Sequence, residues 1–193
     1  MDEGDDSLFC TVDGRGKYEI LCWLATQNTS FKPTFARIFQ KATKDFSAHS
    51  IYPSLGVEST LPQYRATNTS SFSPSQNEYP LWYLFYGTLA IPEVLARQLN
   101  FPAGQVPVLQ PGTIKGGMLE TWAGKYRVLV DAPESEVVNG SAYLVESKEH
   151  EDALRVYETD NYEVVRCEIY LPSGPVMGCS FRFVGTVDGL VPC

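Results

Sequence analysis

With 193 residues, of which 44% are hydrophobic and 12% aromatic, the chain is long enough to bury one sizeable core. Its formal net charge of −8 excludes electrostatic capture of nucleic acid or of an anionic membrane, because both need a clustered positive field. We therefore expect one main globular domain with an appendage, and neither a nucleic-acid nor a membrane partner.

The cysteines and the amino-terminal residues indicate a soluble protein without a metal site. The five cysteines form no C-x-x-C pair and the two histidines lie at no ligand spacing, so the sequence favours buried or incidental thiols over a zinc site or a disulfide framework. The first ten residues, MDEGDDSLFC, lack the basic start and apolar core of a secretory signal. No stretch has the ~20 apolar residues of a membrane span. Together these features predict a cytoplasmic protein.

Residues 1–80 are predicted to form an N-terminal extension. KYEILCWLA, residues 17–25, is typical of a strand. A helix is predicted over residues 32–46, with Pro33 near its start and apolar side chains at helical spacing: Phe35, Ile38, Phe39, Ala42 and Phe46. Residues 47–80 are rich in Ser, Thr, Asn and Pro, which indicates a linker or surface loop. Because one strand and one helix cannot bury their own apolar faces, we expect the extension to dock on the rest of the chain or on a partner.

Residues 81–193 are predicted to form an α+β domain. Apolar and polar residues alternate in several segments, as in half-buried antiparallel strands, and Ser173-Gly174 supplies a hairpin turn. We expect a sheet of six or seven strands that curls into a small mixed or antiparallel β-barrel, with two helices packed outside. The predicted strands are 81–86, 111–120, 124–131, 140–146, 162–171 and 175–185, and the predicted helices are 92–100 and 149–157.

The first candidate for chemistry is the loop Tyr86-Gly87-Thr88-Leu89, which ends the most hydrophobic strand. A glycine there can adopt positive φ and lets a ligand approach the backbone, while the helix that follows offers free N–H groups to an anion. The loop therefore resembles a cradle for a carboxylate. The alternative is a strand that merely turns at a glycine into a helix.

The second candidate is Glu158, which follows the apolar face of the predicted helix 149–157. Flanking aromatic residues would enclose its carboxyl group and raise its pKa toward the range of a general base. The alternative is an ordinary solvated loop residue. Nearby, Ser147 is a suitable N-cap, and His150 is expected to face solvent near the start of this helix. The neighbouring carboxylates are expected to be structural and to complement the helix dipole: Glu149, Glu151 and Asp152.

Four segments in order resemble the γ-glutamylcyclotransferase-like family, also called AIG2-like. They are LFYGTL, GTIKGGMLETWAGKYRVLVDAP, VNGSAYLV and ALRVYETDNYEVVRCEIYL. Members of this family typically carry a Tyr-Gly-Thr/Ser-Leu/Asn loop and a glutamate four residues ahead of a tyrosine, the separation of Glu158 from Tyr162. The resemblance covers residues 81 to about 185 and does not extend to residues 1–80.

The resemblance implies a cofactor-independent enzyme with no metal, which acts on a small-molecule substrate. In such an enzyme Glu158 would accept and donate the proton while an α-amine attacks its own γ-glutamyl carbonyl and 5-oxoproline is released. The loop Tyr86, Gly87, Thr88 and Leu89 would hold the substrate's α-carboxylate or amine. Tyr126 and Tyr162 would line the pocket beside them.

Two other functions remain open from the sequence. The same scaffold, with its long N-terminal extension, suits a tailoring enzyme of specialised metabolism that acts on a non-glutamyl substrate. It also suits a binding or regulatory protein without turnover, since a fold alone does not fix function. The oligomeric state is not predicted.

Overall fold

The chain divides into two compact units, Met1–Ile38 and Phe39–Cys193. The computed structural model describes residues 14–27, 29, 31, 33–34, 40–59, 61–67, 72–185 and 190–192, with only the backbone for 14–18 and 190–192. Among the helices of these residues, none has the length and apolar character needed to cross a bilayer.

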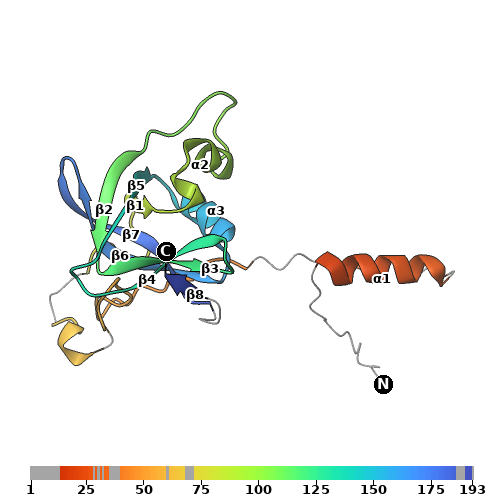
Figure 1. Ribbon diagram of the computed structural model, residues 1–193, viewed down its shortest axis with the longest axis horizontal. Coiled ribbons are helices and arrows are strands. Elements are labelled where there is room, and N and C mark those ends of the chain that lie inside the picture. The colour runs from red at the N-terminus through yellow and green to blue at the C-terminus, as the bar shows by residue number, and fades with distance from the viewer. Residues whose placement is uncertain are drawn as a thin grey trace, which may run out of the picture. The chain divides into compact units, whose positions relative to one another are not determined.

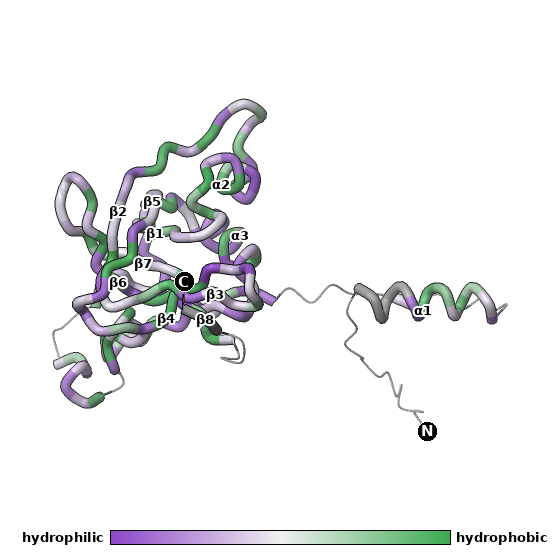
Figure 2. Tube along the Cα trace, viewed as in Figure 1, coloured by the Kyte–Doolittle hydropathy of each residue, from purple (hydrophilic) through white to green (hydrophobic). Residues whose placement is uncertain are grey.

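The described part of the first unit is dominated by helix α1, Gly14–Thr26 (Figure 1). The prediction of a strand over residues 17–25 is therefore wrong. A continuous apolar run does not distinguish a strand from a helix, and this run contains good helix formers such as Leu, Ala, Glu and Lys. Figure 2 shows that the coloured part of α1 is mostly apolar.

The second unit contains a closed five-stranded barrel in the order β1-β5-β2-β6-β7. All neighbouring strands are antiparallel except β1 and β7, which close the barrel in parallel. This arrangement confirms the predicted small mixed barrel, but the barrel has five strands instead of the six or seven expected for the sheet. The strands are β1 (Leu81–Phe85), β2 (Gln110–Lys115), β5 (Val137–Val145), β6 (Tyr162–Leu171) and β7 (Gly174–Phe183).

Three further strands form a separate sheet in the order β4-β3-β8: β3 (Gly117–Trp122), β4 (Tyr126–Asp131) and β8 (Leu190–Pro192). The predicted single strand 111–120 is therefore two strands, β2 in the barrel and β3 in the separate sheet, with the break between them at Gly116. Gly116 has φ +79, and its Cβ would lie 3.1 Å from the Cα of Gly56. The close backbone contact and the positive φ both favour glycine at this break.

Helices α2 (Pro92–Gln98) and α3 (Lys148–Glu158) pack on one side of the barrel, as predicted (Figure 1). A 3₁₀ turn, η2 (Thr88–Ala90), joins β1 to α2. β1 is apolar throughout because the side chains on both of its faces are buried. Tyr83 packs outward with helix residues such as Leu154, and Leu84 packs inward with Ile169. Both β1 residues are fully buried.

The predicted helix 32–46 is wrong from residue 40 onward. Its first apolar positions, Phe35, Ile38 and Phe39, lie outside the described residues. From residue 40 the chain is extended, and Thr43 pairs in parallel with Glu163 of β6. Its buried residues alternate with exposed ones, the period of a strand: Ala42, Lys44 and Phe46.

Residues 47–80 carry little regular structure, apart from a 3₁₀ turn, η1 (Pro62–Tyr64), but their described part is bonded to the barrel. Arg166 of β6 is 3% exposed and donates hydrogen bonds to four main-chain carbonyls in this segment. The acceptors are the carbonyl oxygens of Ser47 (3.2 Å), Ile51 (2.9 Å), Tyr52 (2.6 Å) and Pro74 (2.9 Å). A buried guanidinium with several acceptors explains why a segment of linker-like composition is held on the barrel wall.

Candidate active site

A cavity of about 310 Å³ opens beside the end of β1. All seven predicted site residues line it: Tyr86, Gly87, Thr88, Leu89, Tyr126, Glu158 and Tyr162. They come from the loop after β1, the first residue of β4, the last residue of α3 and the first residue of β6. The fold therefore brings together residues that lie up to 76 positions apart in the sequence, Tyr86 and Tyr162.

Two side-chain hydrogen bonds fix the loop after β1. The hydroxyl oxygens of Thr88 and Tyr157 lie 2.9 Å apart, which ties the loop to α3. The Tyr86 hydroxyl donates to the carbonyl oxygen of Phe181 at 2.7 Å, which ties it to β7. Because Tyr86 uses its hydroxyl proton in this bond, its first role is to position the loop.

Gly87 does not have the positive φ that the sequence predicted; its φ is −115° and its ψ is −143°. A Cβ built on Gly87 would meet no atom within 4 Å. The glycine is therefore not required by the packing of the protein itself. Since Gly87 lines the cavity, a side chain there would compete with a ligand for space.

Glu158 is the last residue of α3, because Thr159 turns away with φ +66°. Its side chain is partly buried, and the loss of hydration raises the pKa of the carboxyl group from 4.5 to about 7. Among the described residues, no hydrogen bond or ion pair holds the carboxylate. Burial, and then the charge of Glu158, raise the pKa values of Tyr86 and Tyr162, so both phenols remain protonated near it.

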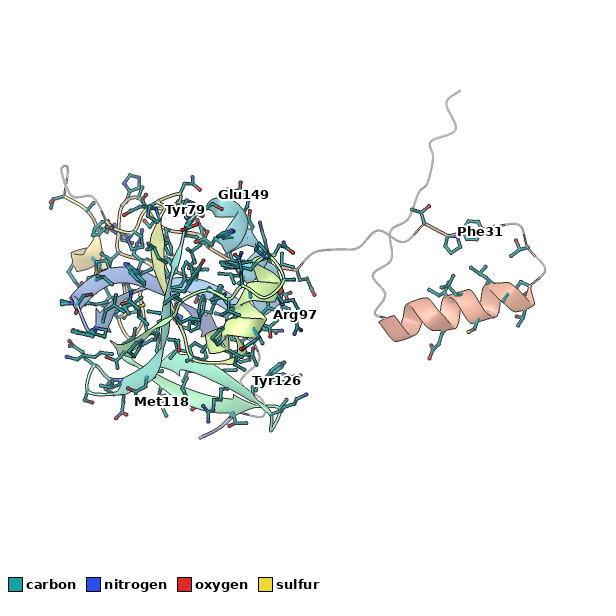
Figure 3. All side chains as sticks on the ribbon, turned by 90° about the horizontal axis from the view of Figure 1, so that it is seen from above. Phe31, Tyr79, Arg97, Met118, Tyr126 and Glu149 are labelled. Carbon is teal, nitrogen blue, oxygen red and sulfur yellow. The ribbon has the colours of Figure 1, made fainter. Side chains whose placement is uncertain are left out.

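A row of aromatic rings connects Tyr162 to Tyr126 across three further strands. Tyr162 meets Phe183 edge-on at 5.6 Å, Phe183 meets Trp122 at 5.3 Å, and Trp122 meets Tyr126 at 6.1 Å between ring centroids. These contacts place the end of the β3–β4 hairpin at the cavity; Figure 3 shows Tyr126 at this end. Trp122 and Phe183 were not predicted, since nothing in the sequence indicates their pairing.

The cavity has six lining residues that sequence reasoning missed: Leu84, Phe85, Ile91, Lys125, Arg127 and Phe181. Leu84, Phe85 and Phe181 are at most 2% exposed and form an apolar floor. Lys125 and Arg127 are exposed and lie on either side of Tyr126. The sequence showed this Lys-Tyr-Arg run at a strand start, but no local signal indicates that the hairpin reaches the cavity.

The start of α3 differs in part from its prediction. Ser147 is confirmed as the N-cap, since its hydroxyl accepts from the His150 amide at 3.3 Å. His150 is partly buried instead of facing solvent, and its Nδ1 is buried without a hydrogen-bond partner among the described residues. Within that part of the chain, no three His, Cys, Asp or Glu side chains cluster as a metal ion would require.

Glu151 lies in the first turn of α3, where a carboxylate complements the helix dipole, and it is only 2% exposed. It accepts a hydrogen bond from Lys44 at 2.6 Å and from the Tyr79 hydroxyl at 2.6 Å, and a third from the Tyr83 hydroxyl. Figure 3 shows Tyr79 near Glu149 at the start of α3, away from Tyr126. This buried network therefore fastens the 40–80 segment to α3.

Several solved structures resemble the chain. The solution structure of At5g39720.1 from Arabidopsis thaliana is 18% identical, with a TM-score of 0.49, and the match covers 58% of this chain and 76% of that one. At3g28950.1, also from Arabidopsis thaliana, is 21% identical over 57% of this chain and 66% of that one, with a TM-score of 0.48. A structure entitled Gamma-glutamyl cyclotransferase is 13% identical over 54% and 67%, with a TM-score of 0.44.

A search of curated proteins finds no significant match. The sequence profile of a family described as "Gamma-glutamyl cyclotransferase, AIG2-like" matches residues 83–185, which is more than half of the chain. This span runs from β1 to the end of β7 and contains every residue of the cavity. The chain belongs to the γ-glutamyl cyclotransferase, AIG2-like family.

Proposed function

We propose that this protein is a cyclotransferase that converts a γ-glutamyl amide into 5-oxoproline and a free amine, with Glu158 as its acid and base. The observation that carries the proposal is the position of Glu158. It lies in a cavity beside the family's Tyr-Gly-Thr-Leu loop, and its carboxyl group has a pKa of about 7. A pKa near the working pH is the best value for a group that must take up a proton and then return it.

The reaction needs one such group. The substrate's α-ammonium cannot attack, so the Glu158 carboxylate removes a proton from it. The amine nitrogen then forms a bond to the γ-carbonyl carbon and closes a five-membered ring. As the amide C–N bond breaks, the carboxyl group returns the proton to the departing nitrogen. The ring nitrogen then gives up a second proton through the same carboxylate, and the departing amine takes it up and leaves as an ammonium ion. The sum of protons and bonds balances without any co-reactant.

Positioning supplies the rest of the rate increase in this proposal. The attack is intramolecular, so a site that holds the substrate folded, with nitrogen near carbonyl, gains most from orientation. The cavity volume of about 310 Å³ lies at the lower end of the range of ligand pockets, about 300–1,000 Å³, and suits a compact ligand. The apolar floor of Leu84, Phe85 and Phe181 excludes water beneath the reacting atoms.

The loop Tyr86–Leu89 is proposed to bind the α-carboxylate through its main chain. In its 3₁₀ turn the first internal hydrogen bond runs from the Ala90 amide to the Gly87 carbonyl at 3.0 Å. The amides of Thr88 and Leu89 precede that bond and have no acceptor within the turn. Tyr126 and Tyr162 are proposed to enclose the substrate, with Tyr162 as a neutral hydrogen-bond donor.

The test is a mass-spectrometric screen for 5-oxoproline, with purified protein and a panel of γ-glutamyl amino acids, peptides and amines. Glu158→Gln keeps the shape of the side chain but removes its basicity, so turnover is expected to fall by about 10²–10⁴-fold. Glu136→Gln, at an exposed position outside the cavity, is the matched control and is expected to act like the wild type.

Comparable turnover by Glu158→Gln would show that the base lies elsewhere. If no γ-glutamyl compound is turned over, the same screen with other acyl amides tests the tailoring-enzyme alternative. The near-neutral pKa of Glu158 favours an enzyme over a binding protein, since a binding site has no need of a carboxyl group poised to exchange protons.

A further inference from the structure

The N-terminal extension completes one edge of β6. β7 pairs with β6 along its whole length, and on the other edge β2 pairs with residues 169–170. Nearer to the start of β6, this second edge pairs in parallel with the extension, through Thr43 beside Glu163 and Ser54 beside Arg166. The extension therefore supplies the main-chain hydrogen-bond partners that a further strand of the barrel would supply.

The extension also holds both ends of the connection from α3 to β6. On the helix side, the Ala42 amide donates to the Arg155 carbonyl at 2.8 Å, and the Arg155 Nε donates to the Ala42 carbonyl at 2.7 Å. On the strand side, the Thr43 amide donates to the Tyr162 carbonyl at 3.1 Å. Glu158 lies between these two anchors, three residues after Arg155 and four residues before Tyr162.

Ala42 belongs to the apolar layer that borders the cavity. It is 0% exposed and lies in the same buried cluster as Leu89 and Phe181, which line the cavity. The Arg155 side chain is 12% exposed, so its bond to Ala42 is largely shielded from water. A displaced Ala42 would admit water near the end of α3, and the raised pKa of Glu158 depends on the loss of hydration there.

We propose that the extension positions the connection from α3 to β6 for the reaction, with Ala42, Thr43 and Arg155 as its positioning residues. Each of them lies outside the cavity lining, so each acts through Glu158 or Tyr162. This inference rests on the proposed function. It makes a segment that precedes the family match part of the catalytic framework.

The first test is Arg155→Met, which removes the bond to the Ala42 carbonyl and keeps an apolar side chain. The base should then be less well placed, so kcat is expected to fall about tenfold while KM changes little. Because Glu158 gains hydration, the apparent pKa of the kcat/KM profile should fall by about one pH unit. Loss of the Arg155 charge alone would raise this pKa. An unchanged kcat, or a pKa that is unchanged or raised, would overturn the proposal.

Tyr79→Phe is the matched control. It also removes one hydrogen bond between the extension and α3, the bond from the Tyr79 hydroxyl to Glu151 at 2.6 Å, but at the start of the helix. We expect it to lower the unfolding temperature about as much as Arg155→Met does and to leave kcat and the pH profile unchanged. Equal kinetic effects of the two variants would overturn the proposal, because they would show that any loosening of the extension slows the reaction.

Thr43→Pro tests the strand side of the same contact. Proline lacks the amide that donates to the Tyr162 carbonyl, whereas Thr43→Ala keeps this amide and changes only an exposed side chain. The proline variant should show the same fall in kcat and in the apparent pKa, and the alanine variant should show neither. If neither Thr43→Pro nor Arg155→Met folds, the contact serves the whole fold and the proposal is overturned.

An NMR titration separates this inference from the proposed reaction. The carboxyl carbon of Glu158, assigned by its absence in Glu158→Gln, reports the pKa without any substrate. This pKa is expected at about 7 in the wild type and about one pH unit lower in Arg155→Met and Thr43→Pro. Equal values in the three proteins would overturn the inference. Failure of every γ-glutamyl compound to yield 5-oxoproline would instead count against the cyclotransferase function.

Discussion

The hydroxyl oxygens of Thr88 and Tyr157 lie 2.9 Å apart, sixty-nine positions apart in the sequence. Thr88 belongs to the loop proposed to bind the substrate, and Tyr157 directly precedes Glu158, the proposed base. This hydrogen bond thus sets the separation between the group that holds the substrate and the group that moves its proton.

Removal of either hydroxyl group should therefore loosen the same geometry. We expect Thr88→Val and Tyr157→Phe each to lower kcat/KM roughly two- to tenfold, the worth of one hydrogen bond, about 0.5–1.5 kcal/mol. The double variant should be no worse than either single one. Steady-state kinetics would check this, with Tyr170→Phe as the control, since its hydroxyl bonds Glu168 outside the cavity. Additive losses would show that the two hydroxyl groups act independently.

The pH dependence of the rate should follow the ionisation of Glu158. Because burial raises the pKa of this carboxyl group to about 7, kcat/KM is expected to rise about tenfold per pH unit below pH 7 and to level off above it. A profile recorded between about pH 5.5 and 8.5 would test this. A rate that is flat across this range would mean that a carboxyl group with an ordinary pKa, or none, removes the proton.

The stability of the fold should also depend on the ionisation of Glu158, but in the opposite direction, because the ionised form favours the reaction and disfavours folding. The folded state binds the Glu158 proton more tightly than the unfolded chain, whose pKa is near 4.5, so ionisation between these two values weakens folding. At about 1.4 kcal/mol per pH unit, the cost reaches roughly 3 kcal/mol above pH 7. Glu158→Gln cannot ionise and should gain up to this much over the wild type between about pH 5 and pH 8.

Urea unfolding of both proteins at the two pH values measures this difference. Glu136→Gln, whose exposed carboxyl group is outside the cavity, should show no such gain. A Glu158→Gln protein that is destabilised equally at both pH values would contradict a raised pKa.

Gly87 offers a test of the loop that does not disturb the fold. Because a Cβ at Gly87 meets no protein atom within 4 Å, Gly87→Ala should unfold at nearly the wild-type temperature. Gly87 lines the cavity, so the added methyl group should raise KM several-fold and Gly87→Val should raise it further. Thermal unfolding and KM, measured on the same samples, would show whether the glycine serves the ligand; unchanged KM in both variants would show that it does not.

Replacing only one partner of the buried Lys44–Glu151 ion pair should strongly lower the free energy of unfolding. Glu151→Gln leaves the Lys44 ammonium, whose side chain is 1% exposed, without its partner at 2.6 Å. We expect a loss of about 3–5 kcal/mol of unfolding free energy, partly recovered by adding Lys44→Met. In contrast, Lys148→Gln breaks an exposed pair with Asp152 and should cost less than about 1 kcal/mol. No difference between the two single variants would contradict the inferred role of this network.

A residue of the cavity could be predicted from the sequence only where it belongs to a local sequence motif. Gly87 and Glu158 were found because a glycine after a hydrophobic strand and a carboxylate among aromatics are local patterns, and the family supplied their pairing. Lys125 and Arg127 were missed because their place at the cavity depends on contacts between rings on four strands. No segment of sequence contains that information by itself.

The fold could be predicted where the spacing of the apolar residues and the surroundings of the segment in the fold favour the same secondary structure. β6 and β7 are joined by a short turn at Ser173-Gly174 that the sequence indicates, and their predicted hairpin is correct. Residues 40–46 fit both a helical and an alternating pattern, and the backbone bonds of Ala42 and Thr43 to Arg155 and Tyr162 decide for the extended form. The prediction of a strand at 17–25 was wrong because a short apolar run is compatible with both a strand and a helix.

Arg166 also limits how the chain can be shortened. The family match begins at residue 83, so a fragment that contains only the matched region would start at about residue 81. Such a fragment would leave the guanidinium of Arg166 without its four carbonyl acceptors and Glu151 without Lys44. The shortest version of this protein that folds independently is therefore expected to start near residue 40, some forty residues before the boundary that homology alone would suggest.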